Sequence, residues 1–124
     1  MNLPAAMTGL ALHIEQFGPI AHLVTVGSKG APHVVSVRVG WDGPELAVAA
    51  GRRSATNVEA RSDVTLLWGP TPGSSYSLIV DGTARLRTGG LHAMLAIEPT
   101  SALLHRSAKC DASSPMCITV LAKP

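Results

Sequence analysis

The residues best suited to chemistry lie in the segment 47–57, AVAAGRRSATN. An apolar run ends at Gly51 and is followed by Arg52, Arg53, Ser54 and a segment of helical composition. The first N–H groups of a helix have no partner within the helix, and the helix dipole adds partial positive charge there. Two guanidinium groups and a hydroxyl beside them would hold a phosphate through charge-assisted hydrogen bonds. A capped helix with two solvated arginines fits the same short pattern, so both interpretations stay open.

A second candidate group lies in the segment 33–39, HVVSVRV. Alternation places Val34, Ser36 and Arg38 on one face of a strand and the other residues on the opposite face. An arginine in the middle of an apolar strand must reach solvent, an acidic side chain or a ligand. An ion pair with an acid such as Asp63 or Glu59 and a contact with a ligand are both compatible with the sequence.

Small residues form the end of the apolar run before Gly51, namely Ala47, Ala49 and Ala50. Small side chains let a flat group approach the backbone of a strand. Tight packing against the N-terminal segment would favour the same residues, and locally this second interpretation is the stronger one.

Other catalytic and metal-binding patterns are weak in this sequence. The spacings of His92, His105, Cys110 and Cys117 match no standard zinc site, and we expect no metal. The chain has no phosphate loop and no nucleophile elbow, and no catalytic residue is assigned. Two cysteines without an export signal are expected to be reduced thiols in a cytoplasmic protein.

The elements that must position these residues are mainly strands. Turn residues recur every 8–12 residues from position 27 onward, which is typical of a β-barrel or sandwich. A bulge is expected at Gly82, and one short helix is expected over 54–61 with Ser54 as its N-cap. We expect a helix within the N-terminal segment 1–17 and a flexible loop over 106–115. The expected strands are 21–26, 33–39, 45–50, 63–68, 76–86, 91–98 and 116–121.

Composition limits the classes of function. The 124 residues suffice for a single domain, 1–124, and 46% hydrophobic residues exclude a disordered chain. A net charge of +2 and only four aromatic residues argue against a nucleic-acid partner, and no apolar run is long enough to cross a membrane. Only 15% of the residues are charged, so we expect a partner to cover apolar surface, most simply in a homodimer.

The order of these features resembles the pyridoxamine 5'-phosphate oxidase-like, FMN-binding split-barrel family. The resemblance runs from Gly18 to Leu86, about two thirds of the chain. It consists of a strand, a G-x-P-H turn, a strand, a D-G turn, a strand, an Arg-Ser helix and a D-V-x-L-L strand. The stretch SYSLIVDGTARL then resembles the family's long strand with a glycine bulge. This resemblance implies a six-stranded, Greek-key split barrel with a few short helices, and a homodimer with flavin mononucleotide (FMN) at its interface.

The resemblance also implies a set of cofactor-binding residues. At the phosphate, Arg53 is kept, Ser54 replaces a lysine, and Arg52 is a candidate to compensate. Arg38 keeps the basic end of the second strand on the phosphate or ribityl side, and Ser77 stands where the other subunit contributes a glutamine. The flavin ring would lie along the second strand and the backbone of the third. The complete candidate set is Arg53, Ser54, Arg52, Arg38, Ser36, Val35, Val34, Val48, Ala49, Ala50, Asn57 and Ser77.

We therefore predict an FMN-dependent oxidoreductase that acts on an unknown small molecule. One alternative is a reductase of the same fold that uses the 8-hydroxy-5-deazaflavin coenzyme. The long anionic tail of that coenzyme would favour an additional basic groove, for which Arg61 and Arg87 are available. Another alternative is a non-catalytic flavin-binding or dimeric barrel. A haem-binding branch of the fold exists, but no residue stands out as its axial ligand.

A true pyridoxamine 5'-phosphate oxidase is not expected. That enzyme must bind the phosphate of its substrate beside the phosphate of FMN, which requires two sets of basic donors. In the family's oxidases a C-terminal extension rich in Arg, His and Trp supplies much of the second set. After Leu91 this chain offers only Arg106, Lys109 and Lys123 as fixed cations, and no tryptophan.

Overall fold

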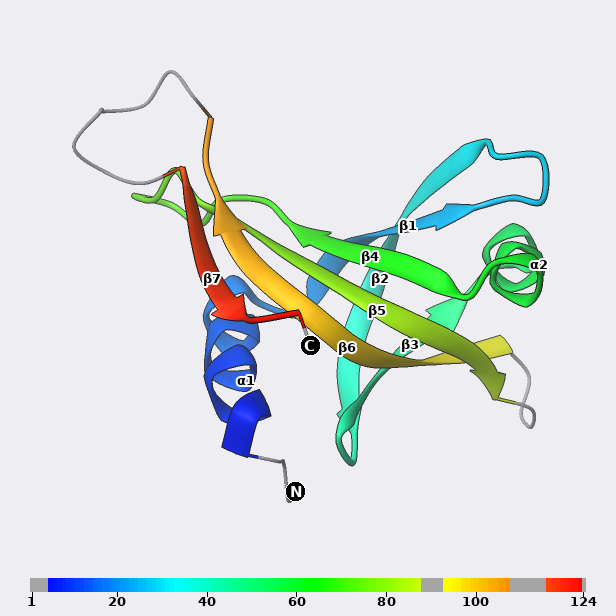
Figure 1. The fold of residues 1–124 in the computed structure, drawn as a ribbon, viewed down its shortest axis with the longest axis horizontal. Helices are drawn as coiled ribbons and strands as arrows, with labels where there is room; N and C mark the ends of the chain where they lie inside the picture. The colour runs from blue at the N-terminus through cyan, green and yellow to red at the C-terminus, as the bar shows by residue number, and fades with distance from the viewer. Residues whose placement is uncertain (1–4, 88–92, 108–115, 124) are drawn as a thin grey trace.

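The computed structural model describes residues 5–87, 93–107 and 116–123. The elements follow one another as a helix, three strands, a second helix and four strands (Figure 1). Their bounds are α1 Ala5–Phe17, β1 Ile20–Val26, β2 Pro32–Asp42, β3 Glu45–Ala50, α2 Arg52–Ala60, β4 Asp63–Trp68, β5 Ser77–Arg87, β6 Ala93–His105 and β7 Cys117–Leu121.

Six strands close into an antiparallel barrel. The sheet order is β3-β2-β1-β4-β5-β6-β7, and β3 also pairs with β6, which closes the first six strands. Strand β7 extends the sheet beyond this closure. Because β1, β2 and β3 are successive neighbours and β4 returns to lie beside β1, the connection is a Greek key. Helix α2 forms the return from β3 to β4. The predicted split-barrel fold is confirmed.

The core fills the inside of the barrel. Five strands each contribute one leucine that is completely buried, namely Leu23, Leu46, Leu66, Leu78 and Leu95. In β1, β3, β4 and β5 these residues alternate with more exposed ones, as expected for a sheet with one buried face, whereas in β6 the next residue, Ala96, is buried as well. Burying a leucine side chain stabilises the fold by about 1.5–3 kcal/mol, so this ring of leucines is a large part of the driving force.

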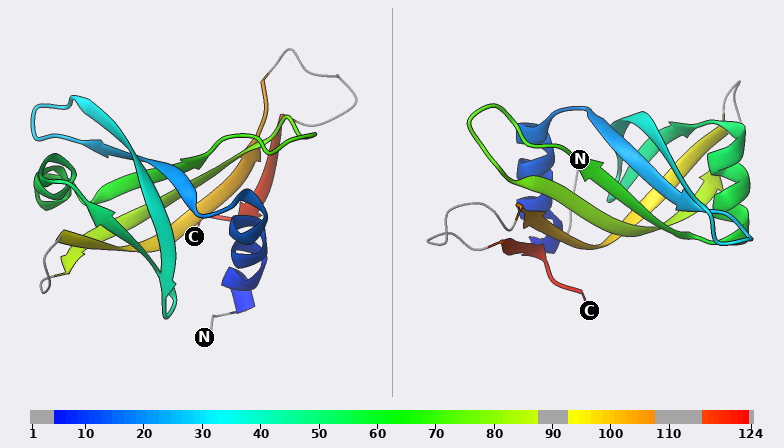
Figure 2. Two further views of the ribbon diagram at one scale, coloured as in Figure 1. Left: turned by 180° about the vertical axis from the view of Figure 1, so that it is seen from behind. Right: turned by 90° about the horizontal axis from the view of Figure 1, so that it is seen from above.

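The two helices lie at opposite ends of the barrel. Figures 1 and 2 show α1 beside β7 at one end and α2 beside the β1–β2 loop at the other. Leu10 and Ile14 are one turn apart and face the core, which explains why the N-terminal segment folds as the expected helix. Gly18, with φ of +96°, ends α1, and its carbonyl oxygen accepts a 2.9 Å hydrogen bond from the indole of Trp68.

Most expected strand positions are confirmed, but β2 and β6 are longer than expected. The strand predicted over 33–39 spans Pro32–Asp42. The strand predicted over 91–98 continues past Pro99 to His105, while residues 91 and 92 lie outside the described part of the chain. Pro99 has no N–H to donate, but it pairs with Gly82 where the β5–β6 register shifts, so the ladder loses little there. Of the loop expected over 106–115, only 106 and 107 are described.

The bulge expected at Gly82 is confirmed, because the β5–β6 register shifts between Asp81 and Gly82. The backbone of β6 passes very close to this glycine. A Cβ added at Gly82 would lie 2.7 Å from the Glu98 carbonyl oxygen and 2.7 Å from the Ile97 Cγ2 atom. Only a residue without a side chain therefore fits at this position.

Replacing Gly82 with alanine should lower the free energy of unfolding by about 1–3 kcal/mol, the usual cost of overpacking a core. Urea denaturation of the purified variant measures this change. Gly40→Ala is the matched control, because a Cβ on Gly40, also within a strand, would meet no atom within 4 Å. Equal stability of the two variants would show that the close approach at Gly82 is unimportant.

Candidate functional site

Strands β2 and β3 separate along part of their length, and this opens a split in the barrel wall. They pair only from Val39↔Val48 to the hairpin turn. Before Val39, β2 pairs with β1 alone, whereas β3 after Val48 pairs with β6. In the part of the chain that the structure describes, no strand therefore pairs with the outer edge of β2 over residues 32–38.

Backbone groups on this edge of β2 are turned toward the split. The Val39 N–H donates a 2.7 Å hydrogen bond to the Pro19 carbonyl oxygen, so Val39 faces the β1 side. Because successive residues of a strand direct their N–H and C=O groups to opposite edges, Val34, Ser36 and Arg38 direct theirs into the split. All three side chains are exposed on the outer surface, and Val34 is 56% exposed. The predicted alternation is confirmed.

Small residues border the other side of the split. Ala49 is exposed and Ala50 half-buried at the end of β3. Two other candidates, Val35 and Val48, face the core, and Val48 is completely buried. Strand alternation is the reason, so Val48 offers a ligand only its backbone atoms, whereas Val35 is half-buried. The expected contact of Val35 with the flavin ring stays a prediction.

A cavity of about 350 Å³ lies between α2 and the β1–β2 loop. Arg53 enters it from the first turn of α2, and Asn57 enters it one turn later. Lys29 lines it from the loop, and His33 lines it from the start of β2. No carboxylate lines the cavity, which makes it suited to an anion. Its lining residues are Gly27, Ser28, Lys29, Ala31, Pro32, His33, Arg53 and Asn57.

Helix α2 begins two residues earlier than expected, and this moves Ser54. Gly51 is the N-cap residue, with φ of −75° and ψ of 173°, and no side chain caps the helix. Ser54 therefore lies in the first turn, where it is 1% exposed and its hydroxyl has no hydrogen-bond partner among the described residues. The expected N-cap role is wrong. Ser54 does not line the cavity, and its expected contact with a phosphate stays a prediction.

Asn57 holds α2 against the barrel. Its side-chain amide donates a 3.0 Å hydrogen bond to the hydroxyl oxygen of Thr25, and both residues are buried. Its carbonyl oxygen lies close to Gly27, where an added Cβ would approach it to 3.2 Å. Asn57 thus sets the distance between α2 and the β1–β2 loop, and with it the width of the cavity.

The remaining arginines of the candidate set lie apart from the cavity. Arg38 is five residues beyond His33, a rise of about 16 Å along the strand, so it lies at the far end of the split. Arg52 is exposed and does not line the cavity. No ion pair of Arg38 with Asp63 is present among the described residues.

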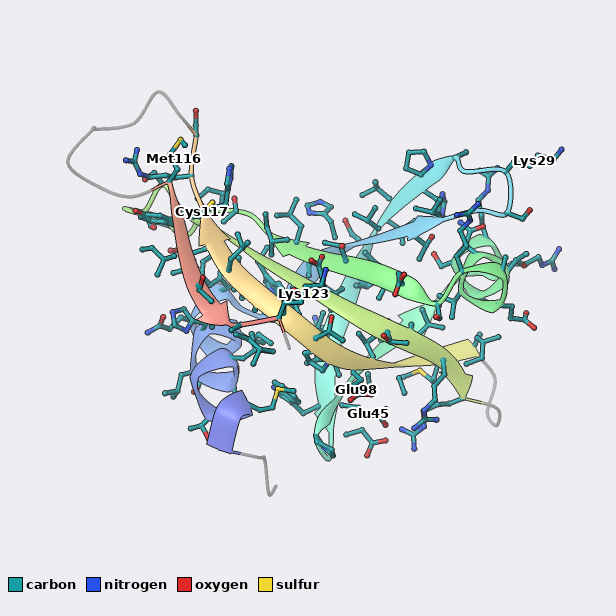
Figure 3. All side chains as sticks on the ribbon, viewed as in Figure 1. Lys29, Glu45, Glu98, Met116, Cys117 and Lys123 are labelled. Atoms are coloured by element: carbon teal, nitrogen blue, oxygen red, sulfur yellow. The ribbon has the colours of Figure 1, made fainter. Side chains whose placement is uncertain are left out.

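Two ion pairs join the described strands outside the cavity. Arg85 contacts Glu45 at 2.7 Å, and Arg87 contacts Asp42. Both acids flank the β2–β3 hairpin turn. Figure 3 shows Glu45 well away from Lys29, which lies at the end of the β1–β2 loop near α2.

Ser77 and Arg53 lie toward opposite ends of the barrel. Thr83 pairs with Asp63, which begins β4 just after α2, whereas Ser77 pairs with His105. The six residues from Ser77 to Thr83 span about 20 Å. Within one chain, Ser77 therefore does not join the cavity.

Six of the eight residues that line the cavity were not in the predicted set, namely Gly27, Ser28, Lys29, Ala31, Pro32 and His33. The segment 27–32 was expected to be only a turn. The available signal was the Greek-key order, because a return helix between β3 and β4 passes the β1–β2 end of the barrel. From that order one could infer that the β1–β2 loop contacts α2. One could not infer that the side chains of Lys29, His33 and Arg53 line the same cavity.

Two further hollows lie elsewhere on the surface. One, of about 360 Å³, surrounds Asp81, whose carboxylate accepts hydrogen bonds from Thr65 at 2.7 Å and Ser101 at 3.3 Å. The other, of about 440 Å³, is mostly apolar and lies between α1 and the end of β2, beside Trp41. Neither contains a residue of the predicted set.

The described residues hold no group of three or more His, Cys, Asp and Glu side chains that could bind a metal ion. His92 and Cys110 lie outside these residues, while His105 and Cys117 are both exposed. No described helix is long and apolar enough to cross a membrane.

Comparison with known sequences finds uncharacterised relatives. Proteins of Mycobacterium bovis and Mycobacterium tuberculosis are each 41% identical to this chain over 106 residues, which is 75% of this chain and 75% of each relative. No family model matches the chain.

Comparison with solved structures finds the same barrel in several proteins. A Clostridium acetobutylicum protein related to general stress protein 26, of the pyridoxinephosphate oxidase family, has a TM-score of 0.67 at 12% identity over 94% of this chain and 95% of its own. The haem storage protein HutZ of Vibrio cholerae scores 0.60 at 15% identity over 73% and 89%. An F420 reductase scores 0.58 at 20% identity over 68% and 90%. At these identities the likeness concerns the fold.

Replacing Asn57 with alanine should lower the free energy of unfolding by about 1–3 kcal/mol, because the buried Thr25 hydroxyl loses its partner. Chemical denaturation measures this loss. Thr56→Ala is the control, since Thr56 is an exposed neighbour on the same helix. If both variants were equally stable, Asn57 would not hold the helix in place.

Proposed function

We propose a flavin-binding function for this chain, which belongs to the family of the two mycobacterial proteins and has the split barrel of pyridoxamine 5'-phosphate oxidase-like proteins. The cofactor is of the FMN type, with its phosphate in the cavity beside Arg53 and its ring in the split between β2 and β3. The observation that carries the proposal is the position of an acid-free basic cavity at the open end of an unpaired strand edge.

The cavity supports the phosphate end of this proposal. The Arg53 guanidinium offers two parallel N–H donors, which match the geometry of a phosphate. The ring of His33 adds a further N–H donor. With no acid in the lining, these groups are available to an anion, and Asn57 keeps the two walls apart.

The split supports the ring end. N–H and C=O groups of Val34 and Ser36 point into it without a strand partner, so they can satisfy polar atoms on the edge of a planar ring. Ala49 and Ala50 leave room for a flat group on the β3 side. The outward side chain of Arg38 at the far end would add positive charge near the ring. When bound, the flavin would supply the electron or hydride transfer.

The reaction we propose is an oxidation or reduction of a small molecule. The chain's own part is to bind and orient the cofactor, and none of the residues at the cavity or the split is assigned as an acid or a base. Few described cations are available for a second phosphate. Arg106 is 3% exposed, and Lys123 lies beside Asp81 on the outer face of the barrel. The protein is therefore not proposed to be a pyridoxamine 5'-phosphate oxidase.

A homodimer is part of the same proposal. Leu67, Ile79 and Leu103 are register partners across β4, β5 and β6, and their side chains form a half-exposed apolar row on the outside of the barrel. Covering such a row removes apolar surface from water. Ser77 lies on the same face of β5, so a second copy could bring its Ser77 to the split, which the first copy's own Ser77 does not reach.

Replacing Arg53 with alanine should weaken FMN binding on the order of 10-fold, because one charge-assisted hydrogen bond contributes about 1.5 kcal/mol at an exposed site of this kind. Titration of FMN by fluorescence quenching measures the affinity. Arg52→Ala removes the same charge from the adjacent position outside the cavity, and it should weaken binding less than about 5-fold. Equal losses in the two variants would contradict the assignment of the cavity.

A further inference from the structure

We propose that Lys29 and Arg61 form a second anion subsite beside the Arg53 cavity, so that the site accepts a ligand with another anionic group attached to its phosphate. This inference rests on the proposed function, because it takes the Arg53 cavity as the phosphate site. Arg61 follows the last residue of α2, and Lys29 lies in the β1–β2 loop that faces the helix.

The helix turns Arg61 toward the loop. Arg53, Asn57 and Arg61 follow one another at intervals of four residues, so they lie along one stripe of α2. Both Arg53 and Asn57 line the cavity, which fixes the direction of this stripe. Nη2 of Arg61 lies 3.5 Å from the carbonyl oxygen of Ser28, another residue of the cavity wall. The guanidinium of Arg61 therefore lies at the rim of the cavity.

The loop presents Lys29 at the same rim. The Gly27 N–H donates to the Ala31 carbonyl oxygen at 3.0 Å, and the Gly30 N–H donates to the Gly27 carbonyl oxygen at 2.8 Å. Gly30, with φ of +86°, completes this tight turn. The backbone is thus held in shape while the exposed lysine extends from the end of the loop, near α2 (Figure 3). Its long side chain can reach an anion at the rim.

Among the residues that the structure describes, no acid forms an ion pair with a cation at this rim. The ion pairs found among the described residues involve Arg85 and Arg87, and none involves Lys29, Arg53 or Arg61. The nearest acids along the chain do not line the cavity. Glu59 is exposed on a different face of α2 from Arg61, and Asp63 lines the separate hollow around Asp81. Unpaired like charges so close together create a positive potential that an anion would neutralise.

The spacing of these cations requires more than one anionic centre. Arg53 and Arg61 are eight residues apart, which corresponds to about 12 Å along the helix axis. One phosphate group held by Arg53 would leave Arg61 and Lys29 without an anionic partner. A second anionic group, such as another phosphate or a carboxylate, would contact both of them. The structure thus points to a cofactor or substrate whose anionic part extends from the cavity to its rim.

Calorimetric titration with inorganic phosphate and with pyrophosphate tests the subsite. The parent protein should bind pyrophosphate about 10-fold more tightly than phosphate. Arg61→Gln and Lys29→Gln should each weaken pyrophosphate binding about 3- to 10-fold, the range expected for one solvent-accessible charge contact, and should change phosphate binding less than twofold. Lys123→Gln removes a lysine charge from the outer face around Asp81, and it should behave like the parent protein.

The subsite would be overturned if the parent protein bound neither anion or bound both equally. It would also be overturned if Arg61→Gln weakened the binding of phosphate and of pyrophosphate equally. The same holds if Arg61→Gln and Lys123→Gln had the same affinity for pyrophosphate. A parallel FMN titration separates this inference from the proposed function. One possible result is that Arg61→Gln loses the preference for pyrophosphate while the protein binds no FMN. This result would support the subsite and contradict the proposed flavin-binding function. The opposite result is that the protein binds FMN through Arg53 but does not prefer pyrophosphate to phosphate. This result would support the flavin-binding function and contradict the second anion subsite.

Discussion

The change of partner along β3 is the constraint on which the rest of the structure depends. The first part of β3 pairs with β2 and its last residues pair only with β6, so one short strand both closes the barrel and leaves it split. Closure buries the leucine core and removes the open edge of β6. The split leaves the edge of β2 over 32–38 with backbone groups that still need partners. A ligand with a planar, hydrogen-bonding edge would satisfy them.

Charge is distributed along the barrel to match this geometry. Near the β2–β3 hairpin, Asp42 and Glu45 each neutralise an arginine. Beside α2, the cations at the cavity have no acid among the residues that line it. The net charge of +2 does not reveal this separation, because it sums the whole chain. It does not distinguish the end where arginines are paired with acids from the end where they are not. The basic end is also where the split opens, so an anionic group and a ring could belong to one ligand.

Local patterns predicted the features that depend on neighbouring residues in the chain. Alternation placed Val34, Ser36 and Arg38 on the outside of β2, and turn residues placed the ends of β3 and β4 correctly. Gly82 was identified as a bulge because a glycine within a strand is costly without a reason. These inferences succeed because side-chain direction in a strand repeats with a period of two, whatever the strand pairs with.

Features that depend on distant contacts could not be predicted in this way. Pro99 looked like the end of a strand, yet it lies opposite a bulge 17 positions earlier in the chain. Ser54 looked like an N-cap, but the helix begins at Arg52 and buries it. Lys29 looked like an ordinary turn residue until α2 folded back beside it. In each case the partner lies in another element, and a single sequence does not reveal which elements meet.

Native mass spectrometry of the protein in the presence of FMN tests the central claim most directly. The claim is that a flavin-type cofactor occupies a split that a second copy of the chain completes. The predicted species has twice the 12.8 kDa mass of one chain and carries two flavins. A monomer that binds FMN, or a dimer that binds none at saturating concentration, would contradict the account.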